Sequence, residues 1–458
     1  MSHGYVSDPR CERHDVVSLL TTNTGATLML DVATLLDPST ALVSGTQLIA
    51  PSADADPFWR SSAILACQHN QSDDLTKDTS GMVQCSTGAC AETRTDAVVR
   101  TAGEAVERMA LHGPPDEFAT APEMGDRAPK LWTAEAPYSG DPGTRSLGWY
   151  RARRIVDGCE YMVPAGLVEF PGMPDDGVDF DPGPSGAAAG QGYDDALRRA
   201  LLEVIERDSV IVSWARQQHL EPFDLGDVLA VGSQDREWDA LRRLVTKLRS
   251  TGLDPVASWV PSTIDGVVTA VGGVRTTAGQ PQLLSLGVKT ATHAGRALCG
   301  AIQESFQLLG GLRLMTNDPA PHDVVVEEAD RMRWLASPEG VAALEAWIAP
   351  ARADTRQRAI VADGATDIDG MTEPLLDRVL DDGLDPYVVD LTTRLPSRVQ
   401  QMGWSVVKVI PVGYQPLRID ESRTFGWVHA RLQSLEERTG IPARIPPGEI
   451  HPLPHPLP

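Results

Sequence analysis

The sequence predicts a mixed α/β (α+β) fold. Helical and strand-like patterns follow one another irregularly along the 458 residues, which is typical of α/β and α+β proteins. Hydrophobic residues make up 42% of the chain, enough for a large packed core. The length is that of one large domain or of two to three smaller ones.

The first third of the chain is read from its patterns in order. Residues 1–90 mix short apolar runs with Asp, Ser, Gly and Pro, which indicates strands and loops. Apolar residues at helical spacing predict a helix over 91–112. Residues 113–145 are rich in Pro, Gly and Asp and predict a long connection, and strand-like patterning returns over 147–170.

The middle of the chain contains further helices and strands. A loop of small residues at 184–190 precedes a helix over 193–217, and an amphipathic helix over 236–250 stops before Gly252. The other expected elements are strands at 267–274 and 282–288, a helix at 293–313, strands at 387–391 and 405–410, and a helix at 423–438. We therefore divide the chain into an N-terminal strand and loop region (1–80), a main domain (81–440) and a Pro-rich tail (441–458).

Charge and composition exclude several classes of function. The net charge of −23 disfavours nucleic acid as a partner and is compatible with divalent cations or basic partners. No segment approaches the roughly 20 apolar residues that span a bilayer, and residues 1–15 lack the plan of a signal peptide. The six cysteines include no CxxC pair and are expected to be free thiols. We expect a cytoplasmic protein.

The most informative pattern is a repeated pair of oxygen-bearing side chains. The pairs are Glu104 and Glu107, Glu203 and Glu206, and Glu304 and Gln307. Their first members are separated by 203−104 = 99 and 304−203 = 101 residues. Positions i and i+3 share one face of a helix, so each pair projects in one direction.

A single pair of this kind is more often a solvated charged face. Here the helices are otherwise apolar, and the first two pairs are followed directly by Arg108 and Arg207. Carboxylates that converge repel one another unless cations lie between them, and Mg²⁺ prefers carboxylate and phosphate oxygens. Arginine suits phosphate oxygens, and the sequence contains no Walker motif. The residues alone therefore indicate a nucleotide–metal site built from helices.

These motifs together resemble the YcaO family. Ser185-Gly-Ala-Ala-Ala-Gly190, followed by Glu203-Val-Ile-Glu-Arg-Asp208, is similar to that family's small-residue loop and second ATP motif. Glu104-Ala-Val-Glu-Arg108 resembles the first motif, and Glu304-Ser-Phe-Gln307 with Arg313 resembles the third. The resemblance extends over most of the chain from about residue 80 and includes Val406-Val-Lys-Val-Ile-Pro411.

The resemblance implies a YcaO-type fold that uses ATP and Mg²⁺. It implies Glu104, Glu107, Glu203, Glu206 and Glu304 as metal ligands, with Ser185, Arg108, Arg207, Gln307 and Arg313 contacting or supporting the nucleotide. The sequence departs from the pattern at Arg100, where many members have Ser. The loop at 86–89 lacks the lysine that many members have.

The last five residues, Pro454-His-Pro-Leu-Pro458, resemble the PxPxP ending of azoline-forming YcaO cyclodehydratases, whose C-terminus reaches the active site. The resemblance implies a catalytic role for the terminal carboxylate of Pro458. Composition alone favours a solvated Pro-rich end or a ligand for a partner's groove. His451 and His455 are candidate proton carriers, although histidines in tails are usually only solvated.

The resemblance implies ATP-dependent cyclodehydration of Cys, Ser or Thr residues in a ribosomally made precursor peptide, which yields azolines. It also implies a separate E1-like or ThiF-like leader-binding partner and a homodimer. Two alternatives stay open. One is a thioamide-forming YcaO enzyme, against which the PxPxP ending argues. The other is a non-catalytic scaffold of a modification complex, which the two departures favour and the retained glutamates disfavour.

Overall fold

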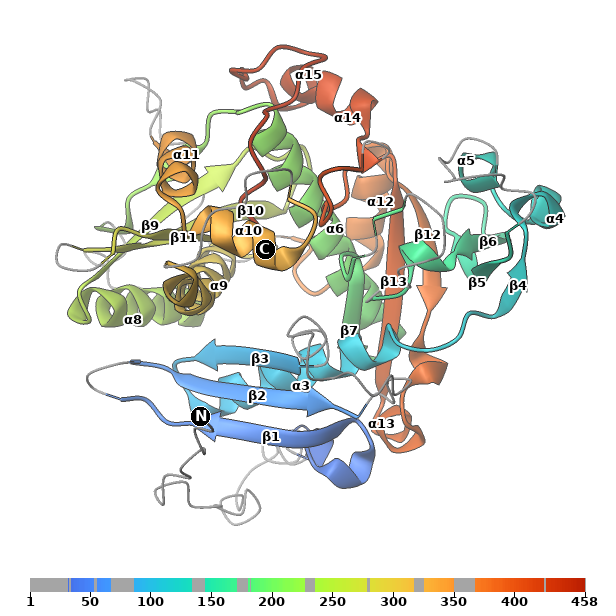
Figure 1. Ribbon diagram of the computed structural model, residues 1–458, viewed down its shortest axis with the longest axis horizontal. Coiled ribbons are helices and arrows are strands. Elements are labelled where there is room, and N and C mark those ends of the chain that lie inside the picture. The colour runs from blue at the N-terminus through green and yellow to red at the C-terminus, as the bar shows by residue number, and fades with distance from the viewer. Residues whose placement is uncertain are drawn as a thin grey trace, which may run out of the picture.

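The fold is known from a computed structural model. It describes residue 32 and residues 34–52, 56–66, 86–133, 145–170, 180–181, 183–226, 235–277, 281–316, 325–349, 367–423 and 426–457. Helices and antiparallel sheets are mixed along the chain, which confirms the predicted fold class (Figure 1). Three sheets each pack against at least one long helix.

The first sheet contains β1 (Val43–Ile49), β2 (Trp59–Leu65) and β3 (Ser86–Ala91) in that order. Helix α3 (Arg94–Ala110) packs against β2 and β3 through a face of small buried residues that includes Ala97, Ala102 and Ala105. The short 3-10 helix η2 (Pro38–Thr40) precedes β1. Because β1 and β2 pair with β3, this sheet continues across residue 80, and the domain division stays a prediction.

The second sheet is the six-stranded one. Its order is β4 (Glu117–Ala119), β5 (Leu147–Arg154), β12 (Asp385–Asp390), β13 (Trp404–Val412) and β7 (Ala187–Gln191), and β6 (Glu160–Pro164) pairs with β5. Its central strands are almost entirely apolar, because helix α6 (Tyr193–Ala215) covers β7 and β13. Helix α12 (Glu373–Asp381) packs against α6.

The third sheet has the order β11 (Leu284–Ala291), β10 (Val268–Thr276), β9 (Leu253–Val260) and β8 (Glu221–Phe223). Helices α8 (Arg236–Ser250) and α9 (Ala294–Met315) lie side by side and cover one face of it (Figure 1). Helix α10 (Glu328–Leu335) packs against α9, and α11 (Pro338–Ile348) contacts β11.

A strand–helix unit occurs three times, as β3–α3, β7–α6 and β11–α9, and each strand packs against the helix that follows it. The first glutamate of each pair lies ten residues after the first residue of its helix (104−94, 203−193 and 304−294). The spacing of about 100 residues in the sequence therefore reflects a structural repeat.

Glycines let strand and helix approach closely in two of these units. A Cβ atom at Gly287 of β11 would lie 2.4 Å from the carbonyl oxygen of Ala301 in α9, and one at Gly190 would lie 2.3 Å from the nitrogen of Ala196 in α6. Such contacts are far below van der Waals distance, so any larger residue would push the helix away from its strand.

Several expectations were wrong in detail. The connection over 113–145 contains β4, α4 (Ala121–Met124), η3 (Gly125–Arg127) and α5 (Lys130–Thr133), while residues 134–144 lie outside the described part. Half of the small-residue loop over 184–190 is strand β7, because alanine and glycine fit where α6 crosses closely.

The predicted helix over 423–438 consists of α14 (His429–Gln433) and α15 (Leu435–Thr439), and Gly440 ends it in the left-handed conformation. The sequence reading did not find β8, β9 and α10 to α12, nor the short η4 (Ala165–Leu167), η5 (Thr392–Arg394) and α13 (Ser397–Gln401).

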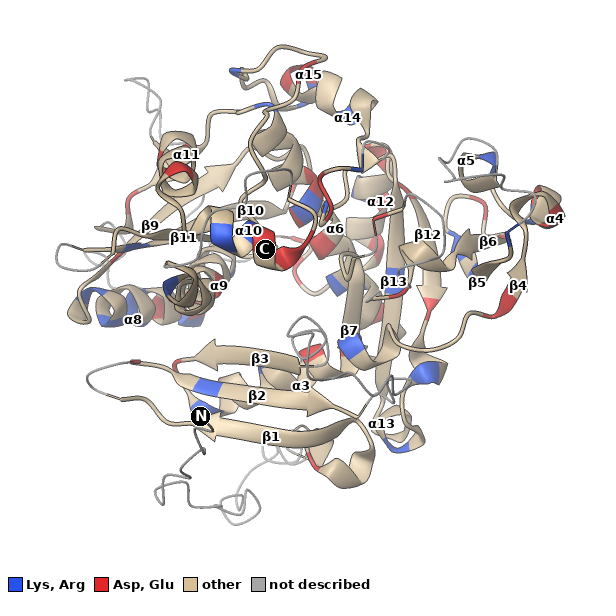
Figure 2. Cartoon of the chain, viewed as in Figure 1, with Lys and Arg blue, Asp and Glu red and all other residues tan. Residues whose placement is uncertain are grey.

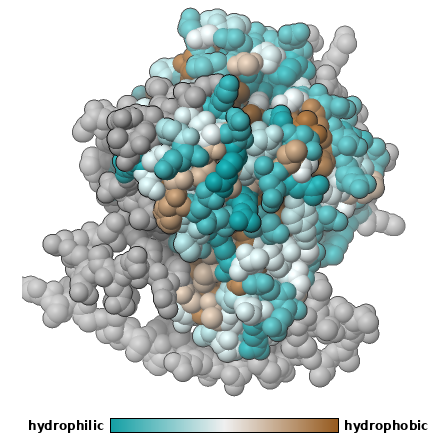
Figure 3. Space-filling view, turned by 90° about the vertical axis from the view of Figure 1, so that its right-hand side faces the viewer, coloured by the Kyte–Doolittle hydropathy of each residue, from teal (hydrophilic) through white to brown (hydrophobic). Residues whose placement is uncertain are grey.

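On the side of the molecule that carries β4, hydrophobic atoms form separate patches within a mainly hydrophilic surface (Figure 3). Phe118 of β4, which is 68% exposed, is one of the large apolar side chains at the surface. Within the described residues, no helix has both the length and the apolar character that crossing a bilayer requires.

Candidate functional site

The carboxylate pairs lie on α3, α6 and α9, and charged residues gather around α6 and α10 in the middle of the molecule (Figure 2). On α3, an Oε atom of Glu104 accepts a hydrogen bond from the backbone nitrogen of Gly88 at 3.3 Å. Arg108 lies 3.8 Å from Glu104 and over the ring of Phe170. The first pair is therefore fixed against strand β3.

The third helix repeats this arrangement. An Oε atom of Glu304 accepts a hydrogen bond from the backbone nitrogen of Val288 on β11, also at 3.3 Å. In both units the carboxylate and the amide that it contacts are 16 residues apart. The strand–helix repeat therefore places Glu104 and Glu304 in equivalent positions.

The carboxylates of α6 lie between those of α3 and α9. Glu206, which is 2% exposed, accepts a hydrogen bond from the backbone nitrogen of Thr290 at 2.7 Å and lies 3.6 Å from the ammonium of Lys289. Arg207 is 3.5 Å from Glu203 and 3.9 Å from Glu206. Helix α6 thus connects both neighbouring helices electrostatically.

Repulsion across the helices raises the pKa of two of these groups. Burial and then the charge of Glu203 raise the pKa of Glu107 to about 8. Burial and then the charge of Glu206 raise the pKa of Glu304 to about 7. The pKa of Glu104 is also raised, mainly by burial. Side chains from three separate repeats therefore converge, which the helical spacing within each pair left open.

Two lysines complete this cluster, and the sequence analysis did not select either as a site residue. Lys289 of β11 has a raised pKa because Glu206 stabilises its charge. Lys408 of β13 is 2% exposed and donates to the carbonyl oxygen of Gly183 at 2.6 Å. Burial lowers the pKa of Lys408 to about 8, against the opposing effect of Glu203 and Glu107. Its signal in the sequence was a single charge within the apolar run Val406–Pro411.

The donor set suits Mg²⁺ held together with phosphates. In the described part of the chain, no three His, Cys, Asp or Glu side chains come close enough to hold a metal ion by themselves. Mg²⁺ usually takes one or two carboxylates and completes its shell with water and substrate phosphates. Among the described residues, Ser185 Oγ and Arg207 Nε are buried and have no hydrogen-bond partner, so both can bind an incoming oxygen atom.

Two more of the predicted nucleotide-contacting residues, Gln307 and Arg313, lie on α9. The amide of Gln307 donates to the carbonyl oxygen of Gly88 at 2.8 Å and accepts from the nitrogen of Cys90 at 3.4 Å, so it joins α9 to β3. Arg313 is exposed in the last turn of α9.

The tail is packed into the protein rather than solvated. Residues 455–457 are buried, and the side chain of Leu457 belongs to the main hydrophobic core. The backbone nitrogen of His451 donates to Ala215 at 2.8 Å, and Trp214 donates to Leu453 at 3.2 Å. Pro458, the predicted catalytic residue, lies outside the described residues.

Arg331 of α10 holds the tail in place. Its guanidinium, 1% exposed, donates to the carbonyl oxygens of His455 at 3.1 Å and Arg418 at 2.9 Å and forms an ion pair with Glu421. Glu421 in turn accepts from the nitrogen of His455 at 2.9 Å.

The imidazole of His455 is fully engaged. Its Nε2 donates to the carbonyl oxygen of Arg418, and its Nδ1 accepts from the nitrogen of Leu457 at 3.3 Å. Burial and the charge of Arg331 keep its pKa well below the usual value. A buried, neutral imidazole with both nitrogens occupied positions the tail and has no free nitrogen with which to carry a proton.

A cavity of about 180 Å³ joins the tail to the carboxylates. Glu104 and Arg108 line one side, and Arg331 and His455 line the other. His455 is thus the tail residue that lines this cavity, and the approach of Pro458 to the site stays a prediction.

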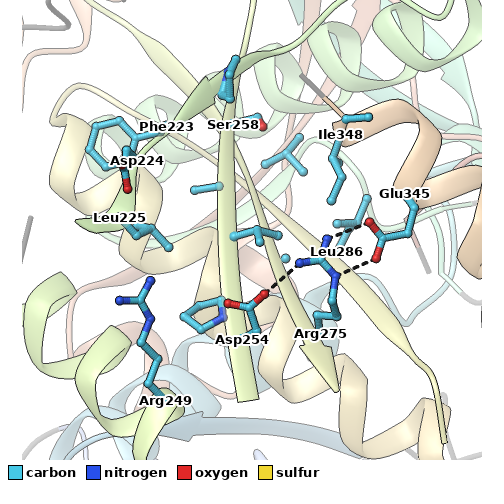
Figure 4. A pocket seen from close by; sticks show the side chains of 17 residues that line it. Phe223, Asp224, Leu225, Arg249, Asp254, Ser258, Arg275, Leu286, Glu345 and Ile348 are labelled. Atoms are coloured by element: carbon cyan, nitrogen blue, oxygen red, sulfur yellow. Dashed lines mark hydrogen bonds and ion pairs between the residues drawn. The ribbon is translucent and has the colours of Figure 1, made fainter. Parts of the chain in front are cut away.

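Another cavity, of about 430 Å³, lies elsewhere, on the face of the third sheet opposite α9 (Figure 4). Its arginine, Arg275, is already paired with Glu345 and Asp254 at 2.7 and 2.8 Å. The charge of Arg275 is therefore balanced, and none of the predicted site residues lines this cavity.

Comparison with known proteins agrees with this geometry. The family model described as "YcaO cyclodehydratase, ATP-ad Mg2+-binding" matches residues 88–414. An uncharacterised protein of Methanothermobacter thermautotrophicus (strain Delta H) is 27% identical over 346 residues, which cover 72% of this chain and 82% of that protein.

Three solved structures share the fold. A heterocyclase in complex with substrate and cofactor matches with a TM-score of 0.68 and 19% identity, over 94% of this chain and 57% of its own. The YcaO protein from Methanopyrus kandleri bound with AMPPCP and Mg²⁺ matches with a TM-score of 0.58 and 21% identity, over 87% of this chain and 94% of its own. A chain of the E. coli microcin synthetase McbBCD complex matches with a TM-score of 0.53 and 14% identity, over 81% of this chain and 88% of its own.

This chain thus spans little more than half the length of the first heterocyclase. The family model, in contrast, covers most of the chain and includes all three carboxylate helices up to Gln307 and Arg313. The chain belongs to the YcaO family, whose cofactors are ATP and Mg²⁺.

Proposed function

We propose that this protein catalyses ATP-dependent cyclodehydration of Cys, Ser or Thr residues in a precursor peptide. The side-chain sulfur or oxygen attacks the preceding backbone carbonyl carbon, and the resulting oxyanion accepts the terminal phosphoryl group that ATP supplies with Mg²⁺. The C–O bond to phosphate then breaks as the amide nitrogen loses its proton and forms the C=N bond of an azoline. The balance is loss of one water from the peptide and conversion of ATP to ADP and phosphate.

The observation that carries this proposal is the convergence of carboxylates from three separate repeats. The pKa values of Glu107 and Glu304 are raised first by burial and then by repulsion from Glu203 and Glu206 of α6. A protein gains no stability from such repulsion, whereas Mg²⁺ ions bound with phosphates would remove it. We assign Glu104, Glu107, Glu203, Glu206 and Glu304 to the metal ions.

The cations around the carboxylates would bind phosphate oxygens. Arg207 has a buried Nε without a partner among the described residues, and Arg108 lines the cavity that leads to the tail. Arginine and Mg²⁺ aimed at developing charge stabilise phosphoryl transfer mainly by position and electrostatics. Ser185 Oγ adds a donor at the same place, while Gln307 and Arg313 would support the helix that carries Glu304.

The tail supports azoline formation over the thioamide alternative. His455 lines the cavity that Glu104 and Arg108 also line, three residues before the terminal residue. The terminal carboxylate of Pro458 is then a candidate to orient the substrate or to accept its proton. The fold neighbours include a heterocyclase and a microcin synthetase complex, which is consistent with a peptide substrate and partner proteins.

The test is an assay of a synthetic peptide that contains Gly-Cys and Gly-Ser, with ATP and Mg²⁺, in the presence and absence of an E1-like partner protein. We expect ATP-dependent loss of water by mass spectrometry together with ADP formation, much faster with the partner. Exchange of a backbone oxygen for sulfur when sulfide is supplied would instead identify a thioamide-forming enzyme. Partner binding without ADP formation would identify a scaffold.

A further inference from the structure

A second cavity, of about 380 Å³, opens beside Lys408 between the end of β13 and helix α5. We propose that it receives a large apolar side chain of the peptide substrate, adjacent to the residue that is modified. This inference rests on the proposed function, because it names the peptide feature that the same site recognises.

The walls of this cavity are apolar. They come from segments far apart in the sequence: Leu131, Trp132, Leu167, Phe180, Ile410 and Trp427. The rings of Trp132 and Phe180 are almost completely buried, at 3% and 4% exposed, so the wall is held firmly in place. Volumes of roughly 300–1,000 Å³ with mainly apolar walls and few polar groups are typical of built ligand sites.

One end of the cavity is polar and coincides with the candidate phosphoryl-transfer site. Ser185 and Lys408 line it there. The Oγ atom of Ser185 is buried and has no hydrogen-bond partner among the described residues, and Lys408 is electrostatically coupled to Glu107 and Glu203. A ligand in the cavity would therefore place its polar end where the phosphoryl group is transferred.

Arg418 supplies a second polar group to the cavity. It is 3% exposed and stacks over Trp427 at 4.3 Å, and its Nε atom has no hydrogen-bond partner in the described part of the chain. A buried donor of this kind is satisfied by an acceptor such as a backbone carbonyl oxygen. The carbonyl oxygen of Arg418 itself accepts from His455, so the same residue touches both the cavity and the tail.

The cavity neighbours the one between Glu104 and His455, because Leu417 lines both of them. A peptide in an extended conformation can keep its carbonyl groups at this polar boundary and place one side chain in the apolar part. At the boundary Lys408 donates to the carbonyl oxygen of Gly183 and Arg418 donates to that of Glu421, and the rest of the wall is mainly apolar, which suits an apolar side chain.

Peptide binding to the full chain tests this without turnover. Blocked peptides Gly-Xaa-Cys-Gly, with Xaa as Phe, Leu, Gly or Asp, are titrated by calorimetry in the presence of Mg²⁺ and the non-hydrolysable analogue AMPPCP. We expect the Phe and Leu peptides to bind about tenfold or more tightly than the Gly and Asp peptides, as a matching apolar pocket provides. Equal affinity for all four, or no measurable binding of any, overturns the proposal.

Two variants that fill the cavity with a larger side chain test whether it is the source of the preference for the Phe and Leu peptides. Leu131→Trp narrows the cavity from α5, and Val428→Trp narrows it from the opposite segment. Each should remove the preference for Phe while AMPPCP affinity changes less than about twofold. The matched control is Leu314→Trp at a position 79% exposed on α9. A preserved preference in both variants places the apolar side chain elsewhere, and loss of AMPPCP binding would instead make this a nucleotide cavity.

The same peptides and variants are assayed for loss of water with the partner present. A Phe preference that depends on the cavity, with no loss of water, would leave the cavity inference standing and reject the proposed cyclodehydration. Loss of water without any preference among the peptides would support the proposed cyclodehydration and reject the cavity inference.

Discussion

At the scale of single residues, the site consists of ionisable groups that are buried away from the solvent that would stabilise their charged forms. Glu107 and Glu304 resist ionisation because burial and a neighbouring carboxylate act in the same direction. Burial lowers the pKa of Lys408 to about 8, although Glu203 and Glu107 favour its charged form. Binding of cations and phosphates together would shift the protonation equilibria of all of these groups at once.

Glu203→Gln and Glu206→Gln each remove one negative charge from α6 and keep the size of the side chain. If these carboxylates hold Mg²⁺, we expect ATP turnover to fall at least about 100-fold while the circular dichroism spectrum is retained. The matched control is Glu437→Gln at an exposed position of α15. Turnover at the wild-type rate in both α6 variants would falsify the metal assignment.

Proton release should accompany metal binding, because Mg²⁺ requires ionised carboxylates. With pKa values of about 8 at Glu107 and about 7 at Glu304, both groups are largely protonated at pH 6. The apparent affinity for Mg²⁺ with AMPPCP should therefore rise between pH 6 and 8, by up to about tenfold per pH unit for each proton released. Calorimetry in buffers of different ionisation enthalpy measures the protons directly, and a flat profile would contradict the raised pKa values.

The stability of the metal-free protein should fall over the pH range in which the affinity for Mg²⁺ rises. The ordinary pKa of Glu is 4.5, so the unfolded chain releases these protons first and the folded protein binds more of them up to about pH 8. The free energy of unfolding should then decrease as pH rises from about 5 to 8. Mg²⁺ and AMPPCP should reverse this loss at pH 8, which thermal unfolding with and without both ligands would measure.

At the scale of elements, three strand–helix units present carboxylates at the same distance from each helix start. The amide contacts of Glu104 to β3 and Glu304 to β11 require each helix to lie close to its strand. Small residues in the strands make this possible: Gly287 in β11 and Gly190 in β7 leave no room for a side chain.

Gly287→Ala tests this packing. The new methyl group would lie 2.4 Å from Ala301 and 2.5 Å from Ser305, so α9 must move away from β11. We expect a loss of about 1–3 kcal/mol in stability and weaker binding of Mg²⁺ with AMPPCP, because Glu304 moves with the helix. Gly45→Ala, at a position with no atom within 4 Å, is the control and should change neither. Unchanged stability in Gly287→Ala would show that α9 does not need this close approach.

At the scale of the whole molecule, the C-terminal tail joins parts of the chain that are far apart. It bonds to the end of α6 through Ala215 and Trp214 and to α10 through Arg331. Leu457 then packs into the core that contains the third sheet. The tail thereby becomes part of the wall between the core and the candidate site.

Removal of Pro454–Pro458 should reduce cyclodehydration strongly and also lower the melting temperature, because Leu457 is fully buried. One additional residue after Pro458 leaves these contacts present and displaces only the terminal carboxylate, by about 3.1 Å in a polyproline-like chain. We expect that variant to keep its melting temperature and its affinity for AMPPCP but to lose most of its activity. Full activity in the extended variant would remove the role proposed for Pro458.

The sequence by itself determined the long helices α3, α6, α8 and α9 and most of the central strands, because their periodicity is local. It also determined that Glu104 and Glu107, or Glu203 and Glu206, share a helix face, since a rise of three residues brings side chains to one side. The family motifs carried by these helices are likewise contiguous segments, so the cofactors could be predicted before the fold was known.

Only the tertiary structure decided which carboxylates face one another. The pairing of Glu107 with Glu203 and of Glu206 with Glu304 joins different repeats, and no local pattern encodes the packing of three helices. The same is true of Lys408, whose role depends on burial between α3 and α6, and of the tail, whose composition alone favoured a solvated end. Burial and electrostatic coupling arise from residues that are distant in the chain, and they become defined only when the sheets and helices pack together.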